Sequence, residues 1–337
     1  MHKLLIHDVT LRDGSHAVGH QLTAAQVASY ASAADKAGIA SIEVGHGNGL
    51  GASSLQVGVS LLPDMEMLRI ARENVFKAKL GIFVIPGFAT INKDLKPAID
   101  AGADSVRVAS HCTEADITER HISYVREKGK DVYGVLMMTH MASKETLTEE
   151  ALKMESYGAQ GVILMDSAGA YLQKDVTEKV SALVRALTIP VGFHAHNNLG
   201  LAVANSVAAA EAGASIIDGS ARGFGAGAGN TPIELLIGVF EKMGFGTGAD
   251  LYRILDASDI AEKELVKTLP FPKPVSIVSG LAGVFSGFAK HVERVALEYK
   301  VDPRDIFFEL GKRRVVAGQE DLIVEVAIEL SKKKERK

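Results

Sequence analysis

Short apolar runs alternate along the chain with longer segments in which apolar residues recur at helical spacing. The short runs are rich in Val, Ile and Leu without alternation, which is typical of parallel strands buried on both faces. Strands are predicted at eight of these runs: Lys3–Val9, Ser41–Val44, Lys79–Ile85, Ser105–Val108, Asp131–Met137, Gly161–Met165, Pro190–Phe193 and Ser215–Ile217. Helices are predicted between them, among others at Thr23–Ala37, Asp64–Phe76, Ala115–Lys128, Thr148–Tyr157, Asp175–Leu187 and Gly200–Ala212.

Glycines punctuate this repeat in a way that helps to choose between two folds. Four glycines close a predicted helix just before the next strand, where the left-handed conformation costs glycine little: Gly38, Gly102, Gly158 and Gly213. Eight strand–helix units are typical of a (β/α)8 barrel, although an open doubly wound sheet shows the same alternation. An open sheet often carries the G-x-G-x-x-G fingerprint, which fails here because Ala228 interrupts the glycine-rich run. Polar residues after nearly every strand also favour an α/β, (β/α)8 TIM barrel.

The strand–helix repeat ends before residue 270. One further helix is predicted at Asp250–Leu269, and the three prolines between residues 270 and 274 indicate a linker. Beyond it, helices are predicted at Gly280–Tyr299, Arg304–Gly311 and Gln319–Lys332. We therefore predict a barrel domain over residues 1–269 and a small helical domain over residues 275–337.

Composition excludes several classes of protein. A net charge of -4 and a pI near 6.3 give no basic field, so nucleic acid is not an expected partner. The start of the chain lacks the apolar run of a signal peptide, and no run of 18 apolar residues predicts a membrane span. Cys112 is the only cysteine, so we expect no disulfides and a reducing, cytoplasmic location.

Two histidines lie at the end of the seventh predicted strand, His194 and His196. Because side chains alternate along a strand, both imidazoles should point to the same side. Asp13 follows the first predicted strand, and in a barrel the ends of strands 1 and 7 open on the same face. One carboxylate and two imidazoles can bind a divalent metal ion and leave positions open for substrate. A pair of core-packed or solvated histidines is the alternative.

Three further polar residues are predicted to reach the same face. Arg12 would supply fixed positive charge where an enolate oxygen develops, and His16 titrates near neutral pH and would move protons. Ser167 follows the sixth predicted strand and should face the cavity. Structural roles stay open at this point, with Arg12 paired to Glu43 or Asp8 and His16 capping a turn.

Several segments, distributed over essentially the whole chain, form a recognisable set: Asp8–His16, Ile42–Gly49, His111–Asp116, Leu136–His140, Met154–Gly158, His194–Asn198, Gly225–Asn230 and Arg313–Asp321. Together they closely resemble the 4-hydroxy-2-oxovalerate aldolases. These are pyruvate aldolases of aromatic meta-cleavage pathways, within the HMG-CoA-lyase-like barrel superfamily.

The resemblance implies a metal-dependent retro-aldol reaction that releases pyruvate and an aldehyde from a 4-hydroxy-2-oxoacid through a pyruvate enolate. It implies metal ligands at Asp13, His194 and His196, an enolate-stabilising Arg12 and a catalytic His16. Mn²⁺ is the expected ion, with Mg²⁺ or Co²⁺ as substitutes. Substrate contacts are expected from four residues: Arg12, Ser167, His194 and Phe285.

The chain departs from the family at one segment. Family members read Gly-Tyr-Ala-Gly-Val-Tyr-Ser-Ser-Phe where residues 280–288 read Gly-Leu-Ala-Gly-Val-Phe-Ser-Gly-Phe. Both tyrosines are absent, at Leu281 and Phe285. The second tyrosine lies in the family's active site, where its hydroxyl helps to orient the substrate hydroxyl. Stereochemical control is therefore expected to differ more than the reaction type.

The resemblance also implies a partner. Family members pair with an acylating aldehyde dehydrogenase, here expected to be an acylating acetaldehyde dehydrogenase, that receives the aldehyde through a tunnel. The helical domain is expected to contact that dehydrogenase or another aldolase subunit in a homo-oligomer.

Three other functions are weighed against this one. An acyl-CoA Claisen-type condensing enzyme or lyase of the same superfamily would carry a cysteine in the glycine-rich loop near strand 8, and Gly225–Asn230 has none. Barrel metal hydrolases usually carry His-x-His on strand 1. A non-catalytic docking subunit would not require an intact set of polar residues at the barrel face.

Overall fold

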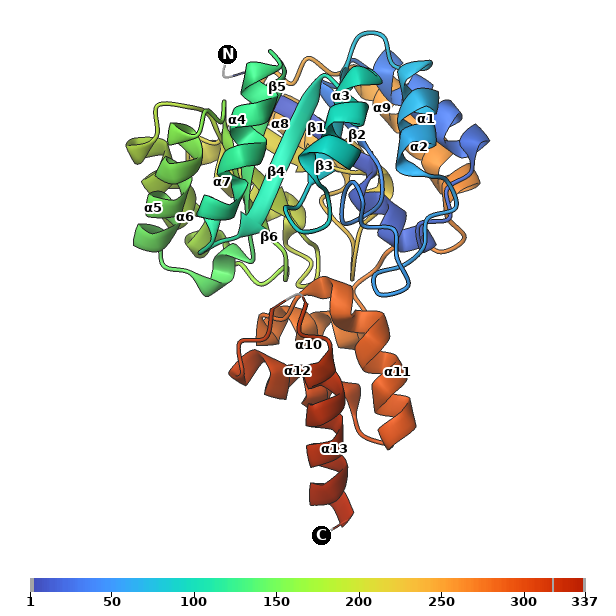
Figure 1. The fold of residues 1–337 in the computed structure, drawn as a ribbon, viewed down its shortest axis with the longest axis vertical. Helices are drawn as coiled ribbons and strands as arrows, with labels where there is room; N and C mark the ends of the chain where they lie inside the picture. The colour runs from blue at the N-terminus through green and yellow to red at the C-terminus, as the bar shows by residue number, and fades with distance from the viewer. Residues whose placement is uncertain (1–2, 317, 336–337) are drawn as a thin grey trace.

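The computed structural model describes residues 3–316 and 318–335, so both outer ends of the predicted domains and residue 317 of the Arg313–Asp321 segment lie outside the described residues. Eight parallel strands close into a barrel in sequence order (Figure 1). The strands are β1 (Leu5–Leu11), β2 (Ser41–Val44), β3 (Lys79–Val84), β4 (Ser105–His111), β5 (Asp131–Met137), β6 (Val162–Asp166), β7 (Val191–Ala195) and β8 (Ile216–Gly219). The predicted α/β fold, a (β/α)8 TIM barrel followed by a helical C-terminal region, is confirmed.

Helices surround the barrel and shield its apolar outer face (Figure 1). They are α1 (Ala24–Lys36), α2 (Asp64–Arg72), α3 (Lys96–Asp100), α4 (Glu119–Glu127), α5 (Lys144–Ser156), α6 (Gln173–Ala186), α7 (Ala202–Glu211), α8 (Ile233–Met243) and α9 (Leu251–Ile260). The glycines predicted to end helices all have positive φ, between 80° and 105°: Gly38, Gly102, Gly158 and Gly213. Within the described residues, no helix has both the length and the apolar character needed to cross a membrane.

A separate helical unit follows the barrel and lies at one end of it (Figure 1). Its helices pack around a second apolar cluster that includes Val292, Phe307 and Val326. They are α10 (Pro274–Ala282), α11 (Ala289–Tyr299), α12 (Pro303–Lys312) and α13 (Asp321–Glu335). Residues 3–335 thus contain a barrel core and a smaller helical core.

Two helix predictions in this part of the chain are wrong. A single helix over Gly280–Tyr299 was predicted, but the chain breaks at Gly283, which adopts a left-handed conformation with φ of 65°. A β-carbon at residue 283 would approach the His140 ring to 3.1 Å, and the carbonyl of Gly283 bonds His140 Nε2 at 2.8 Å. The helix predicted over Asp250–Leu269 ends early, because α9 passes into a π turn at Ala261–Leu265.

The break at Gly283 brings the helical unit onto the carboxyl ends of the strands. Ser286 donates from its Oγ to the carbonyl of Ser167, just beyond β6, at 3.0 Å. Asn198, just beyond β7, donates from its Nδ2 to Ser286 Oγ at 2.9 Å and to the carbonyl of Ala168 at 3.0 Å. These buried contacts fix residues 283–288 at the face of the barrel where the predicted site lies.

Candidate active site and metal centre

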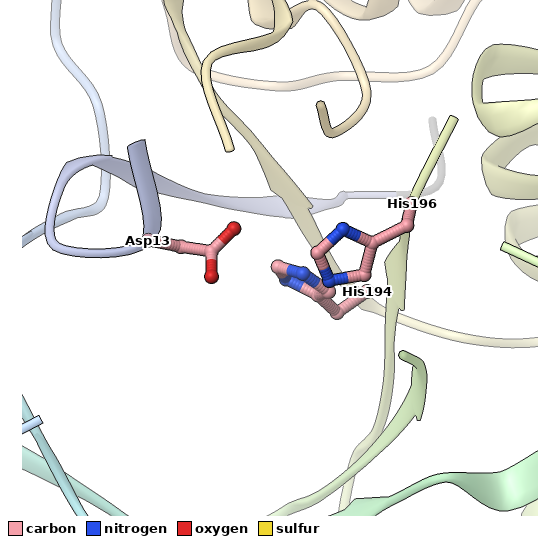
Figure 2. A group of neighbouring side chains, drawn as sticks. All are labelled: Asp13, His194 and His196. Atoms are coloured by element: carbon pink, nitrogen blue, oxygen red, sulfur yellow. The ribbon is translucent and has the colours of Figure 1, made fainter. Parts of the chain in front are cut away.

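Asp13, His194 and His196 converge at the carboxyl face of the barrel. One ligand atom from each side chain lies within 4.8 Å of the others, and all three side chains are buried. Figure 2 shows the carboxylate of Asp13 facing the two imidazoles across a common space. β1 extends two residues beyond its predicted end, to Leu11, and β7 includes His194. The two histidines share a side of the strand as predicted, whereas Ala195 packs into the apolar core.

The ring of His194 is oriented by a carboxylate on the neighbouring strand. Its Nδ1 lies 2.8 Å from Oδ2 of Asp218, at the end of β8. Burial by itself would raise the pKa of Asp218, but the charge of Arg107 and the bond to His194 hold it well below its usual range. An ionised carboxylate only accepts, so Nδ1 of His194 carries a proton, and in the neutral ring the lone pair is on Nε2. That Nε2 is buried and has no hydrogen-bond partner among the described residues.

Asp13 is fixed from two sides. Arg12 donates from Nη1 to Oδ1 at 3.0 Å, and Asn230 donates from Nδ2 to Oδ2 at 2.5 Å. Burial acts to raise the pKa of Asp13, but Arg12 and the nearby histidines lower it below its usual range, so the carboxylate is ionised. The glycine-rich run delivers Asn230 to this position, because a β-carbon at Gly225 would lie only 2.6 Å from the Asn230 amide.

The structural pairing that the sequence left open for Arg12 is present, and its functional role stays a prediction. Its Nε donates to Oε2 of Glu43 at 2.6 Å, and its guanidinium carbon lies 4.3 Å from the centre of the Phe83 ring. The pairing with Glu43 is therefore present, whereas Asp8 instead accepts hydrogen bonds from Thr10 and Tyr30. Within residues 3–316 and 318–335, Nη2 of Arg12 is buried and has no partner.

His16 lies in the short 3₁₀ turn at Asp13–Val18, which follows β1 directly. Its ring lies edge-on to His20, with 4.7 Å between the ring centres, and a side chain at residue 47 would overlap it. Burial lowers the pKa of His16, so the ring is neutral at pH 7. A neutral imidazole can accept a proton, as a general base must.

A cleft of about 540 Å³ separates the barrel face from the helical unit. His16 and Gly58 line it on the barrel side, and Phe285 lines it on the helical side. Asp13, His194 and His196 are at most 5% exposed and are not among the residues that line this cleft. Leu281, the other departure from the family pattern, is 63% exposed on α10. Only Phe285 of the two altered positions therefore bears on the cleft.

Ser167 is buried at the same face, and its Oγ and its carbonyl each accept a hydrogen bond. Its Oγ accepts the backbone N–H of Met138 at 3.0 Å, and its carbonyl accepts from Ser286. The hydroxyl of Ser167 retains its own hydrogen for one further contact. The predicted substrate contact of this residue stays a prediction.

The donor set fits a divalent cation. Two buried cations, Arg12 and Arg107, face three buried carboxylates, those of Asp13, Glu43 and Asp218. These five groups together carry one net negative charge. A divalent ion would reverse that sign, and a substrate carboxylate would then balance it. The unpartnered Nε2 of His194 supplies the lone pair that such an ion requires.

Sequence reasoning missed the residues that orient the ligands. Asp218 and Arg107 lie on β8 and β4, and Asn230 ends a run that the sequence marked only as a turn. A polar residue inside an apolar strand is the one available signal, because it must find a partner when buried. That signal was present at Arg107, whereas Asp218 directly follows the eighth predicted strand, and the signal does not say which partner is found.

Comparison with known proteins agrees with this geometry. A model of the HMGL-like family matches residues 3–261, and a model of the DmpG-like communication domain matches residues 270–332. A 4-hydroxy-2-oxovalerate aldolase of Spirochaeta aurantia is 62% identical over 333 residues, which cover 99% of this chain and 98% of the relative. The chain belongs to the 4-hydroxy-2-oxovalerate aldolase family.

Further comparisons support membership of the aldolase family and the barrel fold. An aldolase of the same name from Pectobacterium atrosepticum is 60% identical over 333 residues, covering 99% of this chain and 97% of the relative. The carboxyl transferase domain of Rhizobium etli pyruvate carboxylase, solved with pyruvate, superposes with a TM-score of 0.80 at 16% identity. That alignment covers 99% of this chain and 61% of the carboxylase chain, and it shows a shared fold.

Proposed function

We propose that this protein cleaves 4-hydroxy-2-oxoacids of the 4-hydroxy-2-oxovalerate type into pyruvate and an aldehyde, with a divalent metal ion bound by Asp13, His194 and His196. The observation that carries the proposal is the convergence of these three side chains beside Arg12 and His16. Relatives that are 60–62% identical over nearly the whole chain bear the name of this activity. The acyl-CoA and docking-subunit alternatives have no comparable support.

The steps of the cleavage up to the enolate can be assigned to groups of the chain. His16 removes the proton from the C4 hydroxyl, the C3–C4 bond breaks, and its electron pair moves through C2 onto the 2-oxo oxygen. The aldehyde leaves, and the remaining fragment is the enolate of pyruvate. Arg12 offers the unpartnered N–H groups of Nη2 to that oxygen. Protonation of the enolate at C3 then gives pyruvate.

The metal ion, when bound, acts as a Lewis acid that polarises the 2-oxo group and stabilises the charge that develops there. Mn²⁺ is the ion that we propose, because one carboxylate and two imidazoles form a mixed N/O set with exchangeable positions. Mg²⁺ and Co²⁺ are the proposed substitutes. The direct test is pyruvate release before and after chelation, followed by addition of each metal separately. A chelated protein that still releases pyruvate at the original rate would contradict the proposal.

The replacement of a tyrosine by Phe285 leads to a prediction about stereoselectivity. A site that hydrogen-bonds a substrate hydroxyl discriminates strongly, whereas an apolar wall separates analogues by about 1–3 kcal/mol. Phe285 lines the cleft together with His16 and is half-buried. We therefore expect both enantiomers of a 4-hydroxy-2-oxoacid to be cleaved at comparable rates, and Phe285→Tyr to sharpen the preference. The measurement is kcat/KM for each enantiomer in both proteins.

Leu281→Tyr is the matched control for this experiment, because it restores the other missing tyrosine at a position that is 63% exposed. It should leave the enantiomer ratio unchanged. A wild-type protein that already prefers one enantiomer by about 100-fold, equivalent to about 2.7 kcal/mol, would show that other residues control C4.

We further propose that the helical domain, over residues 275–337, contacts an acylating acetaldehyde dehydrogenase or a second aldolase subunit. The match to a DmpG-like communication domain supports this proposal. Leu297 on α11 is 83% exposed and Phe308 on α12 is 44% exposed, so both offer apolar surface to a partner. Deleting the domain after residue 269 would also remove Ser286 from the site, so point variants give the cleaner test.

Leu297→Glu and Phe308→Glu are expected to weaken binding of the dehydrogenase, by roughly tenfold where the residue lies near the centre of the interface. Leu152→Glu is the control, since Leu152 is 42% exposed on α5 of the barrel. The dissociation constants are measured with purified proteins, and pyruvate release is checked for each variant alone. Unchanged binding in both helical-domain variants would place the interface elsewhere.

A further inference from the structure

A buried arginine that no step of the proposed reaction uses lies inside the barrel. Arg107 projects from β4, is 3% exposed, and contacts two carboxylates on other strands. Its Nη2 donates to Oδ2 of Asp218 on β8 at 2.5 Å, and its Nη1 donates to Oε2 of Glu43 on β2 at 3.5 Å. A buried charge is costly unless it is paired, so these two carboxylates determine where the side chain lies.

The same two carboxylate oxygens hold the two arms of the proposed active site. Oε2 of Glu43 also accepts from Nε of Arg12 at 2.6 Å, and Oδ2 of Asp218 lies 2.8 Å from Nδ1 of His194. Arg12 and His194 are thus linked through Arg107: Glu43 lies between Arg12 and Arg107, and Asp218 lies between Arg107 and His194. Movement of Arg107 would release both oxygens together.

We propose that Arg107 is a positioning residue. Through Glu43 it holds Arg12, and through Asp218 it holds His194, so that the two side chains keep a fixed position relative to each other. This proposal rests on the proposed function, because that function assigns Arg12 to enolate stabilisation and His194 to metal binding. Within the described residues, Arg107 forms no hydrogen bond with Arg12 or His194 and reaches each through one carboxylate. A carboxylate that orients a ligating histidine typically changes metal affinity or activity by about 10–100-fold when it is disturbed.

The test compares variants of Arg107, at the centre of this hydrogen-bond network, with variants of the two carboxylates that flank it. Arg107→Lys keeps the charge, but a single ammonium group cannot reproduce the planar fork that reaches two carboxylates. We expect it to weaken Co²⁺ binding and to lower kcat, each by about 10–100-fold, with KM for substrate little changed. Co²⁺ affinity and its visible absorption spectrum are measured without substrate, so that positioning of the ligand is observed separately from turnover.

Variants of the two carboxylates should have different effects. Glu43→Gln should lower kcat and weaken Co²⁺ binding less than Asp218→Asn does, because Asn230 still holds Oδ2 of Asp13 when Arg12 is disturbed. Asp218→Asn should weaken Co²⁺ binding and alter its spectrum. These two variants also decide the matter if Arg107→Lys does not fold.

Lys179→Gln is the matched control for general loosening of the barrel. Lys179 is a partly buried cation that donates to the carbonyl of Thr139 and to the hydroxyl of Tyr171, at 2.9 and 3.0 Å. This variant should lower thermal stability and leave Co²⁺ affinity unchanged.

Wild-type affinity and kcat in Arg107→Lys, or in both Glu43→Gln and Asp218→Asn, would overturn the proposal. So would equal weakening of Co²⁺ binding by Lys179→Gln. A wild-type protein that neither binds Co²⁺ nor releases pyruvate would instead remove the proposed function itself.

Discussion

His196→Ala is expected to lose its bound divalent metal and its pyruvate release together. One of the three proposed ligand side chains is removed, and His194 and Asp13 alone would leave a two-ligand site. Lewis-acid stabilisation by a metal contributes several kcal/mol, and each 1.36 kcal/mol is tenfold in rate, so a loss of at least about 10³-fold is expected. Metal content of the purified protein and single-turnover pyruvate release are the two measurements.

The control for this prediction removes a different imidazole. His121 lies on α4, is half-buried, and bonds the carbonyl of Ala89 from Nε2 at 3.3 Å. His121→Ala should retain both metal and activity. A His196→Ala protein that kept stoichiometric metal and full turnover would show that the cluster in Figure 2 is a packed pair of histidines beside a carboxylate.

His16→Ala is expected to slow retro-aldol cleavage by roughly 10²–10⁴-fold, the usual contribution of a positioned acid–base group. Burial lowers the pKa of this ring, which keeps it in the neutral form that accepts a proton at pH 7. The variant should still bind metal, because His16 is outside the proposed ligand set. Cleavage is followed by pyruvate release at substrate saturation and at limiting substrate.

An internal control separates the base from the rest of the site. Exchange of the C3 protons of pyruvate with deuterium requires enolisation, in which Arg12 and the metal would stabilise the charge. This exchange should survive His16→Ala better than cleavage does. If cleavage proceeded at the wild-type rate, another group would have to remove the proton of the C4 hydroxyl.

The sequence predicted the parts of this molecule that depend on local chemistry. The spacing of apolar residues and the Val, Ile and Leu content of the short runs marked all eight strands. The glycines at positions 38, 102, 158 and 213 marked the ends of helices. The alternation of a strand was enough to place His194 and His196 on one side. Strand ends were less accurate, since β4 runs to His111 rather than to the predicted Val108.

The sequence pattern gave a wrong helix boundary at a glycine whose role depends on a contact with a residue far away in the sequence. Gly283 could lie inside a helix or end one, and only the approach of His140 from the barrel decides that it ends α10. Because the helix ends there, Phe285 and Ser286 reach the barrel face. A helix continued through this point would have carried them elsewhere.

The sequence by itself determined the barrel, the face on which its polar residues gather, and three of the residues that meet there, Asp13, His194 and His196. Only the tertiary structure decided how those residues are held. Arg107 and Asp218 are 111 positions apart in the sequence. They are in contact because the sheet closes into a barrel, so that side chains of β4 and β8 point into the same interior. Periodicity reports which side of an element is buried. It carries no information about which buried charge will lie opposite, because that depends on the closure of all eight strands.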